Sequence, residues 1–266
     1  MHITQLRNAT LVLHLGERHI LVDPMLAPQG ALPPLRLLDG KRERNPTVAL
    51  PADSDAVLDR VTHCLITHCQ RGHFDHLDRF GKHWLRTRQI PVICTPHDAP
   101  YLRQRGLRVE ALAEGHAQGV PFFEGRIQTV RCTHGEGLVG RFMEHGVGYY
   151  ITLPGEPTLY LAGDTVLTAG VKAFVTQHQP QVSVVPAGGA RFDVGQDIIM
   201  GLDEVIAFTR LARGTVLANH LEAISHCPVT RAALRAAAEH AGLGQRLRVP
   251  EDGETVSLPQ NEAQLA

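Results

Sequence analysis

The chain has 266 residues, of which 43% are hydrophobic and 20% are charged, and its 26 basic and 27 acidic residues give a formal net charge of −1. A chain of this length can bury its own core, and its near-neutral charge gives no electrostatic footprint for nucleic acid or an anionic membrane surface. No apolar run approaches the roughly 18 residues that span a bilayer, and the first residues lack the features of a signal peptide. We therefore expect a soluble, cytoplasmic protein whose partner is a small-molecule substrate, not nucleic acid or a membrane, with a homo-oligomer left open.

The first half of the chain opens with strands and then alternates strands with helices. Residues 10–15 and 19–24 predict a β-hairpin, and residues 61–67 predict a buried strand. The stretch 27–52 is rich in proline, glycine and charge and is long for a loop, so we expect it to cover the entrance of a site. The other elements predicted in this half are a helix at 77–88, a strand at 91–94 and a helix at 99–105.

The second half shows the same mixture. Two segments carry apolar residues three and four apart, the spacing of one helix face; they begin near Leu202 and Leu234, and the second ends before Gly242. Further predicted elements are strands at 126–132, 147–153, 158–162, 181–185, 215–218, 246–249 and 255–258, and a helix at 169–178. Two sheets packed face to face with helices outside would bury all of these apolar faces. The fold class we expect is α+β, in a single domain over residues 1–266.

Residues 67–78, which follow the predicted strand 61–67, hold the most chemistry. They include three histidines and two carboxylates in twelve residues, and histidine is the commonest metal ligand. Neighbouring side chains diverge in the tight group His73-Phe74-Asp75-His76. That group suits two metal ions side by side, one taking His73 and the other taking Asp75 and His76.

Two ions need more ligands than this segment offers, and three candidates also follow apolar strands. His134 follows the strand ending at 132, Asp164 follows residues 159–163, and His220 follows residues 216–219. Loops at strand ends are where functional sites are built on rigid supports. Taken singly, the two histidines could be structural and Asp164 could cap a helix; their common placement favours ligands.

In this order the motifs resemble the metallo-β-lactamase superfamily of metal-dependent hydrolases, and more narrowly the branch that includes ascorbate-phosphate lactonases. The likeness runs from residue 10 to residue 258. Its segments are the hairpin ending in Asp23-Pro24, Leu65-Ile66-Thr67-His68, His73-Phe74-Asp75-His76, Tyr160-Leu161-Ala162-Gly163-Asp164-Thr165, Pro186-Ala187-Gly188-Gly189 and Asn219-His220-Leu221-Glu222-Ala223.

The resemblance implies a four-layer αββα sandwich with a two-metal site on one edge. It assigns His68, His73 and His134 to one ion, assigns Asp75, His76 and His220 to the other, and makes Asp164 a bridge between both. The ions it implies are divalent, with Zn²⁺ preferred and Mn²⁺ or iron as alternatives, because imidazole and carboxylate ligands suit all three. Asp23-Pro24 is expected to set a turn.

The sequence departs from the family pattern at the first ligand. The family motif is Thr-His-x-His-x-Asp-His, whereas His68 and His73 are five residues apart here. Ungapped alignment from Asp75 would place Arg71 at the first ligand, and a guanidinium cannot bind a cation. We favour His68, because Leu-Ile-Thr-His ends the strand as the family pattern requires, and we keep Cys69 as a further contributor.

The function expected is a metal-dependent hydrolase in which metal-bound hydroxide attacks a small-molecule lactone, ester or phosphodiester. Asp75 could orient the nucleophile or move its proton, and His226 could contact substrate or protonate the leaving group. For His226 a structural role is an equal alternative. Two other hypotheses share the fold: a di-iron redox protein, and a non-catalytic binding protein stabilised by metal.

Overall fold

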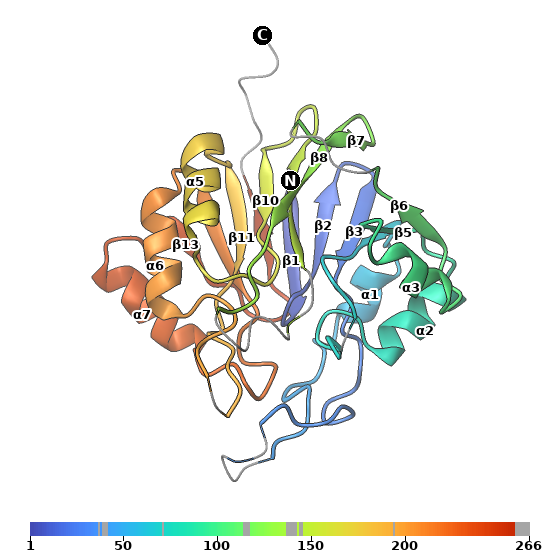
Figure 1. The fold of residues 1–266 in the computed structure, drawn as a ribbon, viewed down its shortest axis with the longest axis horizontal. Helices are drawn as coiled ribbons and strands as arrows, with labels where there is room; N and C mark the ends of the chain where they lie inside the picture. The colour runs from blue at the N-terminus through green and yellow to red at the C-terminus, as the bar shows by residue number, and fades with distance from the viewer. Residues whose placement is uncertain are drawn as a thin grey trace.

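The computed structural model describes residues 1–258 except 37, 39–41, 71, 114–117, 137–142, 144–145 and 194. It contains two seven-stranded mixed sheets that pack face to face, with helices on both outer sides (Figure 1). The predicted α+β sandwich is therefore confirmed. None of the helices in the described ranges has the length and apolar content that crossing a membrane requires.

The first sheet has the strand order β14-β1-β2-β3-β4-β5-β6. Its strands are β1 (His2–Arg7), β2 (Thr10–Leu15), β3 (Arg18–Val22), β4 (His63–Leu65), β5 (Val92–Cys94), β6 (Val109–Ala111) and β14 (Thr255–Ser257). Its outer face is covered by α1 (Ser54–Leu58), α2 (Arg79–Thr87) and α3 (Ala99–Arg103).

The second sheet has the order β13-β12-β11-β10-β9-β8-β7. Its strands are β7 (Val120–Phe122), β8 (Gly125–Arg131), β9 (Val147–Thr152), β10 (Leu159–Leu161), β11 (Val182–Pro186), β12 (Thr215–Asn219) and β13 (Leu247–Arg248). The helices α5 (Ala169–His178), α6 (Leu202–Leu211) and α7 (Arg231–His240) cover its outer face.

The central core lies between the sheets and takes alternate residues from each strand. Leu13 and Ile20 of the first sheet pack with Tyr149 and Val184 of the second. The next residue along a strand points to the opposite face, so Val12 packs on the helical side instead. This explains why β2 and β11 are buried on both faces and consist mostly of apolar residues.

The strand directions create one functional edge. Strands β3 to β6 are parallel, as are β10 to β13, and β8 runs in the same direction as β10 because both are antiparallel to β9. The carboxyl ends of parallel strands meet at the same edge of a sheet, which is where α/β proteins bind ligands. The loops that leave β3, β4, β8, β10 and β12 therefore converge.

Candidate metal centre

The seven predicted ligands lie in these converging loops, and all seven are buried. His68, His73, Asp75 and His76 follow β4, His134 follows β8, Asp164 follows β10 and His220 follows β12. Their ligand atoms form two groups, each with all atoms within 4.8 Å of one another. The first contains His68, His73 and His134, and the second contains Asp75, His76, Asp164 and His220.

Asp164 lies between the two groups. Its Oδ2 is 3.1 Å from Nε2 of His76 and 3.5 Å from Nε2 of His220 in the second group. The same oxygen is 3.5 Å from Nε2 of His134 and 4.0 Å from Nε2 of His68 in the first group. One carboxylate thus faces histidines of both groups, as a bridging ligand must.

The longer loop between His68 and His73 turns back on itself. The backbone N–H of His73 donates to the carbonyl of Gln70 at 3.0 Å, and Gly72 has a φ of +90°. The ring centroids of His68 and His73 consequently lie 4.5 Å apart. Cys69 is not in this cluster, since its Sγ lies 3.6 Å from Oδ1 of Asp98, and Arg71 lies outside the described residues.

The electrostatics prepare the two groups differently. Burial lowers the pKa of His68 well below its usual range and that of His73 to about 4, so both imidazoles are neutral at pH 7. In the second group, burial alone would lower the pKa of His76, but the carboxylates of Asp164, Asp23 and Asp75 together raise it well above its usual value. Burial likewise disfavours the charged form of Asp164, yet His76 and His220 hold its pKa well below normal.

The donor set fits divalent metal ions. Nε2 of His68 and Nε2 of His220 are buried and have no hydrogen-bond partner among the described residues. A buried polar atom without a partner costs about 1–3 kcal/mol. A cation held between these nitrogens and the carboxylates would remove that penalty, and nitrogen and oxygen donors suit zinc, manganese or iron.

In two of the predicted histidine ligands, the ring nitrogen that faces away from the cluster has a partner of its own. Nδ1 of His134 donates to the carbonyl of Ile198 at 2.8 Å, and Nδ1 of His68 lies 3.0 Å from the hydroxyl of Thr67. Partners of this kind fix the tautomer and the orientation of a metal-ligating imidazole.

Asp23 holds His76 and is a functional residue that the sequence did not reveal. Its carboxylate lies 2.8 Å from Nδ1 of His76 and accepts the backbone N–H and the hydroxyl of Thr67. It does stand in a turn, with a φ of +47°, so the expected turn is present. The interaction with His76 depends on the pairing of β3 with β4, and no local sequence pattern predicts that pairing.

Asn8 joins two of the ligand loops. Its side-chain amide donates to the carbonyl of Asp75 at 3.2 Å, while its own carbonyl accepts the backbone N–H of His220 at 2.9 Å. Asn8 lies buried in the turn between β1 and β2 with a φ of +55°, a conformation that asparagine tolerates better than most residues. The sequence analysis did not single out Asn8, because the strand before it, β1, was not predicted.

The stretch 27–52 extends from the bottom of the molecule in Figure 1. It is joined by hydrogen bonds and an ion pair to loops of the second sheet. The hydroxyl of Thr47 donates to the carbonyl of Glu222, and Oδ1 of Asn45 accepts the N–H of Ser225. Nearer its tip, Nε of Arg36 lies 3.6 Å from Oδ1 of Asp193. The stretch thus contacts the loop that carries His220 and the loop after β11; that it covers an entrance stays a prediction.

Apolar side chains pack under the stretch 27–52 and around Cys227. Leu32 and Leu35 of the stretch 27–52 pack with Phe74, which lies between His73 and Asp75, and with Ile224 and Cys227. Phe192 and Met143 pack with Ile198 and with the other side of Cys227. His226 is buried beside Phe192, with ring centroids 5.9 Å apart, and its Nδ1 lies 4.0 Å from Sγ of Cys227.

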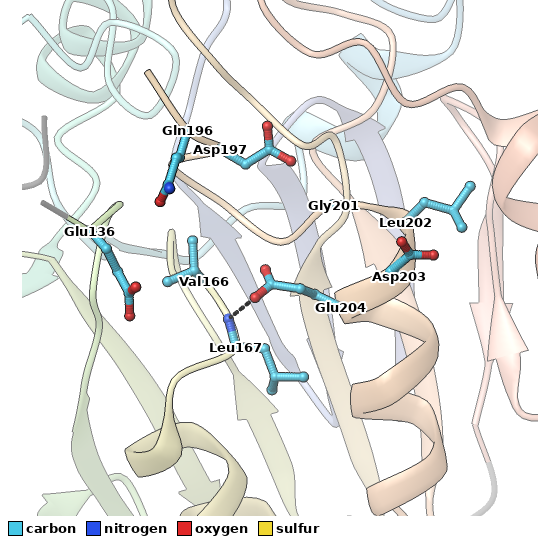
Figure 2. A pocket seen from close by; sticks show the side chains of 9 residues that line it. All are labelled: Glu136, Val166, Leu167, Gln196, Asp197, Gly201, Leu202, Asp203 and Glu204. Carbon is cyan, nitrogen blue, oxygen red and sulfur yellow. Dashed lines mark hydrogen bonds between the residues drawn. The ribbon is translucent and has the colours of Figure 1, made fainter.

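A hollow of about 500 Å³ lies beside the loops that follow β8 and β10, and carboxylates form part of its lining (Figure 2). Glu136 and Val166 belong to the loops that carry His134 and Asp164, and Asp197 and Glu204 complete the acidic wall. Oε1 of Glu204 accepts the backbone N–H of Leu167 at 3.2 Å. Burial, with repulsion from Asp197 and Glu136, raises the pKa of Glu204, so this hollow is unfavourable for anions.

The fold and this ligand cluster define a metallo-β-lactamase-type sandwich. A family model described as "Beta-lactamase superfamily domain" matches residues 18–239. The protein YddR of Bacillus subtilis, assigned to the family UPF0173, is 33% identical over 264 residues, covering 97% of this chain and 100% of YddR. The chain therefore belongs to the β-lactamase superfamily and, within it, to UPF0173.

Two solved structures support the same assignment. An isothiocyanate hydrolase from Delia radicum gut bacteria matches with a TM-score of 0.86 and 29% identity, over 98% of this chain and 100% of that chain. A possible metal-dependent hydrolase from Veillonella parvula matches with a TM-score of 0.86 and 26% identity, over 97% and 99%. The predicted family is confirmed, whereas the narrower likeness to ascorbate-phosphate lactonases stays a prediction.

Proposed function

We propose that this protein is a metal-dependent hydrolase that holds two divalent ions, Zn²⁺ in the first place and Mn²⁺ or iron as alternatives. The observation that carries the proposal is the convergence of seven buried ligand residues, two of which have an imidazole nitrogen without a hydrogen-bond partner among the described residues. His68, His73 and His134 would hold one ion, Asp75, His76 and His220 the other, and Asp164 would bridge them. Such ions, when bound, lower the pKa of a coordinated water to about 7 and polarise the bond to be cleaved.

Two residues of the chain would handle protons. Oδ2 of Asp75 lies 3.4 Å from Nε2 of His220 and 3.8 Å from Nε2 of His76, and there Asp75 would orient the attacking water and accept its proton. His226 is buried beside Phe192, one residue before Cys227. There it would contact the substrate or give a proton to the leaving group.

The substrate class that fits best is a small, uncharged molecule with an electrophilic carbon, and isothiocyanates are the first candidates. The side chains packed under the stretch 27–52 and around Cys227 are apolar or aromatic, among them Leu35, Phe74 and Phe192, and we take them to line the entrance. The carboxylates of Glu136, Asp197 and Glu204, in the hollow beside the loops that carry His134 and Asp164, disfavour an anion there. The isothiocyanate hydrolase reported above resembles this chain over nearly its whole length.

The reaction balances with water alone. Water adds across the carbon–nitrogen bond of R–N=C=S, and the thiocarbamate formed then breaks its carbon–nitrogen bond to release an amine and carbonyl sulfide. One water proton reaches the nitrogen on addition and the other on cleavage of the carbon–nitrogen bond, and these are the transfers that Asp75 and His226 are proposed to serve.

Lactones and esters are the second candidate class, because they present the same kind of uncharged electrophilic carbon to the same apolar entrance. Phosphodiesters, which the sequence left open beside them, carry a negative charge toward the carboxylates of Glu136, Asp197 and Glu204. We therefore rank them last.

The test uses protein stripped with a chelator and then reloaded with Zn²⁺, Mn²⁺ or Fe²⁺. Aryl and alkyl isothiocyanates, lactones, esters and a phosphodiester are offered in turn, and amine, acid or alcohol release is followed. The proposal expects turnover of an uncharged substrate that is lost on stripping and restored on reloading. A fully loaded protein without turnover on the whole panel would favour the non-catalytic alternative, and bound iron with a redox-sensitive absorbance spectrum would favour the di-iron alternative.

A further inference from the structure

The thiol of Cys227 lies directly behind the ligand His220. Its Sγ is 3.4 Å from Nδ1 of His220, a hydrogen-bond distance for sulfur, and 4.0 Å from Nδ1 of His226. Nε2 on the opposite side of the same ring is 3.4 Å from Oδ2 of Asp75 and 3.5 Å from Oδ2 of Asp164. The imidazole therefore spans the distance between the thiol and the cluster.

Support on Nδ1 decides whether His220 can bind a cation. A neutral imidazole carries one proton, and Nε2 offers a lone pair only when that proton is on Nδ1. Among the contacts described for the ring, the sulfur of Cys227 is the group that can accept a hydrogen bond from Nδ1. A sulfur acceptor at this place selects the tautomer that leaves Nε2 free for metal.

The surrounding backbone is shaped for this contact. His220 has a φ of +59°, which is costly for a residue with a side chain, so other contacts must hold it there. At Gly188, after β11, a Cβ would stand 2.2 Å from the carbonyl oxygen of His220 and 3.0 Å from Sγ of Cys227. The absence of a side chain at Gly188 lets the two residues approach.

Packing against two apolar clusters confines the thiol. Cys227 contacts the apolar cluster that contains Ile224 and the one that contains Ile198 and Phe192, and its N–H donates to the carbonyl of Ile224 at 3.0 Å. A side chain confined in this way keeps its direction, which a positioning group requires.

We propose that Cys227 is a positioning residue that holds His220 in the orientation and tautomer required for the second metal ion. The inference rests on the proposed function, because it assumes that His220 is a ligand. Cys227 does for His220 what Asp23 does for His76 and the carbonyl of Ile198 does for His134, with sulfur in place of oxygen.

The test compares C227A, C227S and the control C94A in metal titrations. Cys94 is a buried thiol in β5 with no part in the cluster. Chelator-stripped proteins are titrated with Zn²⁺ against a competing dye to obtain two dissociation constants, and with Co²⁺ to record the visible spectrum. Losing an outer partner of a metal-bound histidine commonly costs about 10- to 100-fold in affinity.

We expect C227A to weaken one of the two sites by about 10- to 100-fold and to alter the Co²⁺ spectrum. C227S, whose hydroxyl can accept the same hydrogen bond, should lie between C227A and the wild type, and C94A should match the wild type. Wild-type dissociation constants in C227A, or identical losses in C227A and C227S, would overturn the role of Cys227. A wild-type protein that fails to bind two equivalents of metal would instead overturn the proposed function.

Discussion

Replacing Asp23 by asparagine should weaken one metal site while leaving the fold in place. The carboxylate lies 2.8 Å from Nδ1 of His76 and accepts the backbone N–H of Thr67 at 2.8 Å. It keeps the imidazole proton on Nδ1, which leaves the Nε2 lone pair for a cation. An amide of the same shape presents a donor as well as an acceptor. Part of the population can then adopt the other tautomer, whose protonated Nε2 cannot bind metal.

The size of the effect follows from the lost interaction. A hydrogen bond to a charged group contributes about 1.5–3 kcal/mol, and each 1.4 kcal/mol is about tenfold in a dissociation constant. The ion next to His76 should therefore bind about 10- to 100-fold more weakly in D23N, which agrees with the usual effect of changing an outer partner of a ligating histidine.

Competition with a chelating dye measures the two dissociation constants, and ¹⁵N NMR of the imidazoles of the zinc-loaded protein reports which nitrogen of His76 carries the proton. The matched control is D98N. Asp98 is also buried and accepts hydrogen bonds from Gln70 and Thr95, but it contacts none of the seven predicted ligands in the contacts described. Unchanged affinity in D23N, or an equal loss in D98N, would refute the reasoning.

Three other predictions concern the bridge, the hairpin turn and the far end of the first sheet. Asp164→Ala should lower metal-dependent turnover by more than about 100-fold with an unchanged circular dichroism spectrum, since direct ligands matter more than outer partners; retained turnover would contradict the bridging role. Asn8→Ala should reduce the free energy of unfolding by about 2–3 kcal/mol in urea, from the lost hydrogen bond to Asp75 and the strain at φ +55°. Asn8→Gly should lose only the hydrogen bond, because glycine adopts this φ without strain. A loss of unfolding free energy as large as that of Asn8→Ala would contradict the contribution from strain. Burial, reinforced by His19, lowers the pKa of His14 to about 4, whereas the pKa of this imidazole in the unfolded chain is about 6.5. As the pH falls, the unfolded state binds the proton before the folded state does. The contribution of His14 to the free energy of unfolding is therefore complete above pH ~6.5 and is lost progressively toward pH ~4. His14→Gln should flatten that fall in denaturation curves at pH 7 and 5, and an unchanged slope would contradict it.

The sequence predicted the elements and ligands that local patterns mark. Apolar runs ending in polar residues located β4, β10 and β12, and the residues that follow them, His68, Asp164 and His220, do converge. The spacing of Leu202 and Val205 likewise located α6, whose observed range is Leu202–Leu211.

Elements without such a pattern were missed. Strand β1 was not predicted because it carries Thr4, Gln5 and Arg7, polar residues that are nevertheless buried. Arg7 is buried because its guanidinium donates to the carbonyls of Met25, Ala27 and Val48 at the base of the stretch 27–52. Strands β6 and β7 and helix α1 are too short to show a period.

The supporting residues of the site could not be predicted for a related reason. Asp23, Asn8 and Cys227 act on ligands that come from other strands or loops, so their role exists only once the two sheets have packed. The residues next to Cys227 and Asn8 in the sequence do not indicate which ligand each of them contacts. Tertiary contact supplies the information that the linear pattern lacks.

A crystal structure of the zinc-loaded protein, with anomalous scattering recorded at the zinc edge, tests the central claim most directly. We predict two peaks about 3.5–4 Å apart. One would lie among His68, His73 and His134, the other among Asp75, His76 and His220, with Asp164 touching both. A map without a peak among these side chains, or with zinc bound only elsewhere on the protein, would contradict the account.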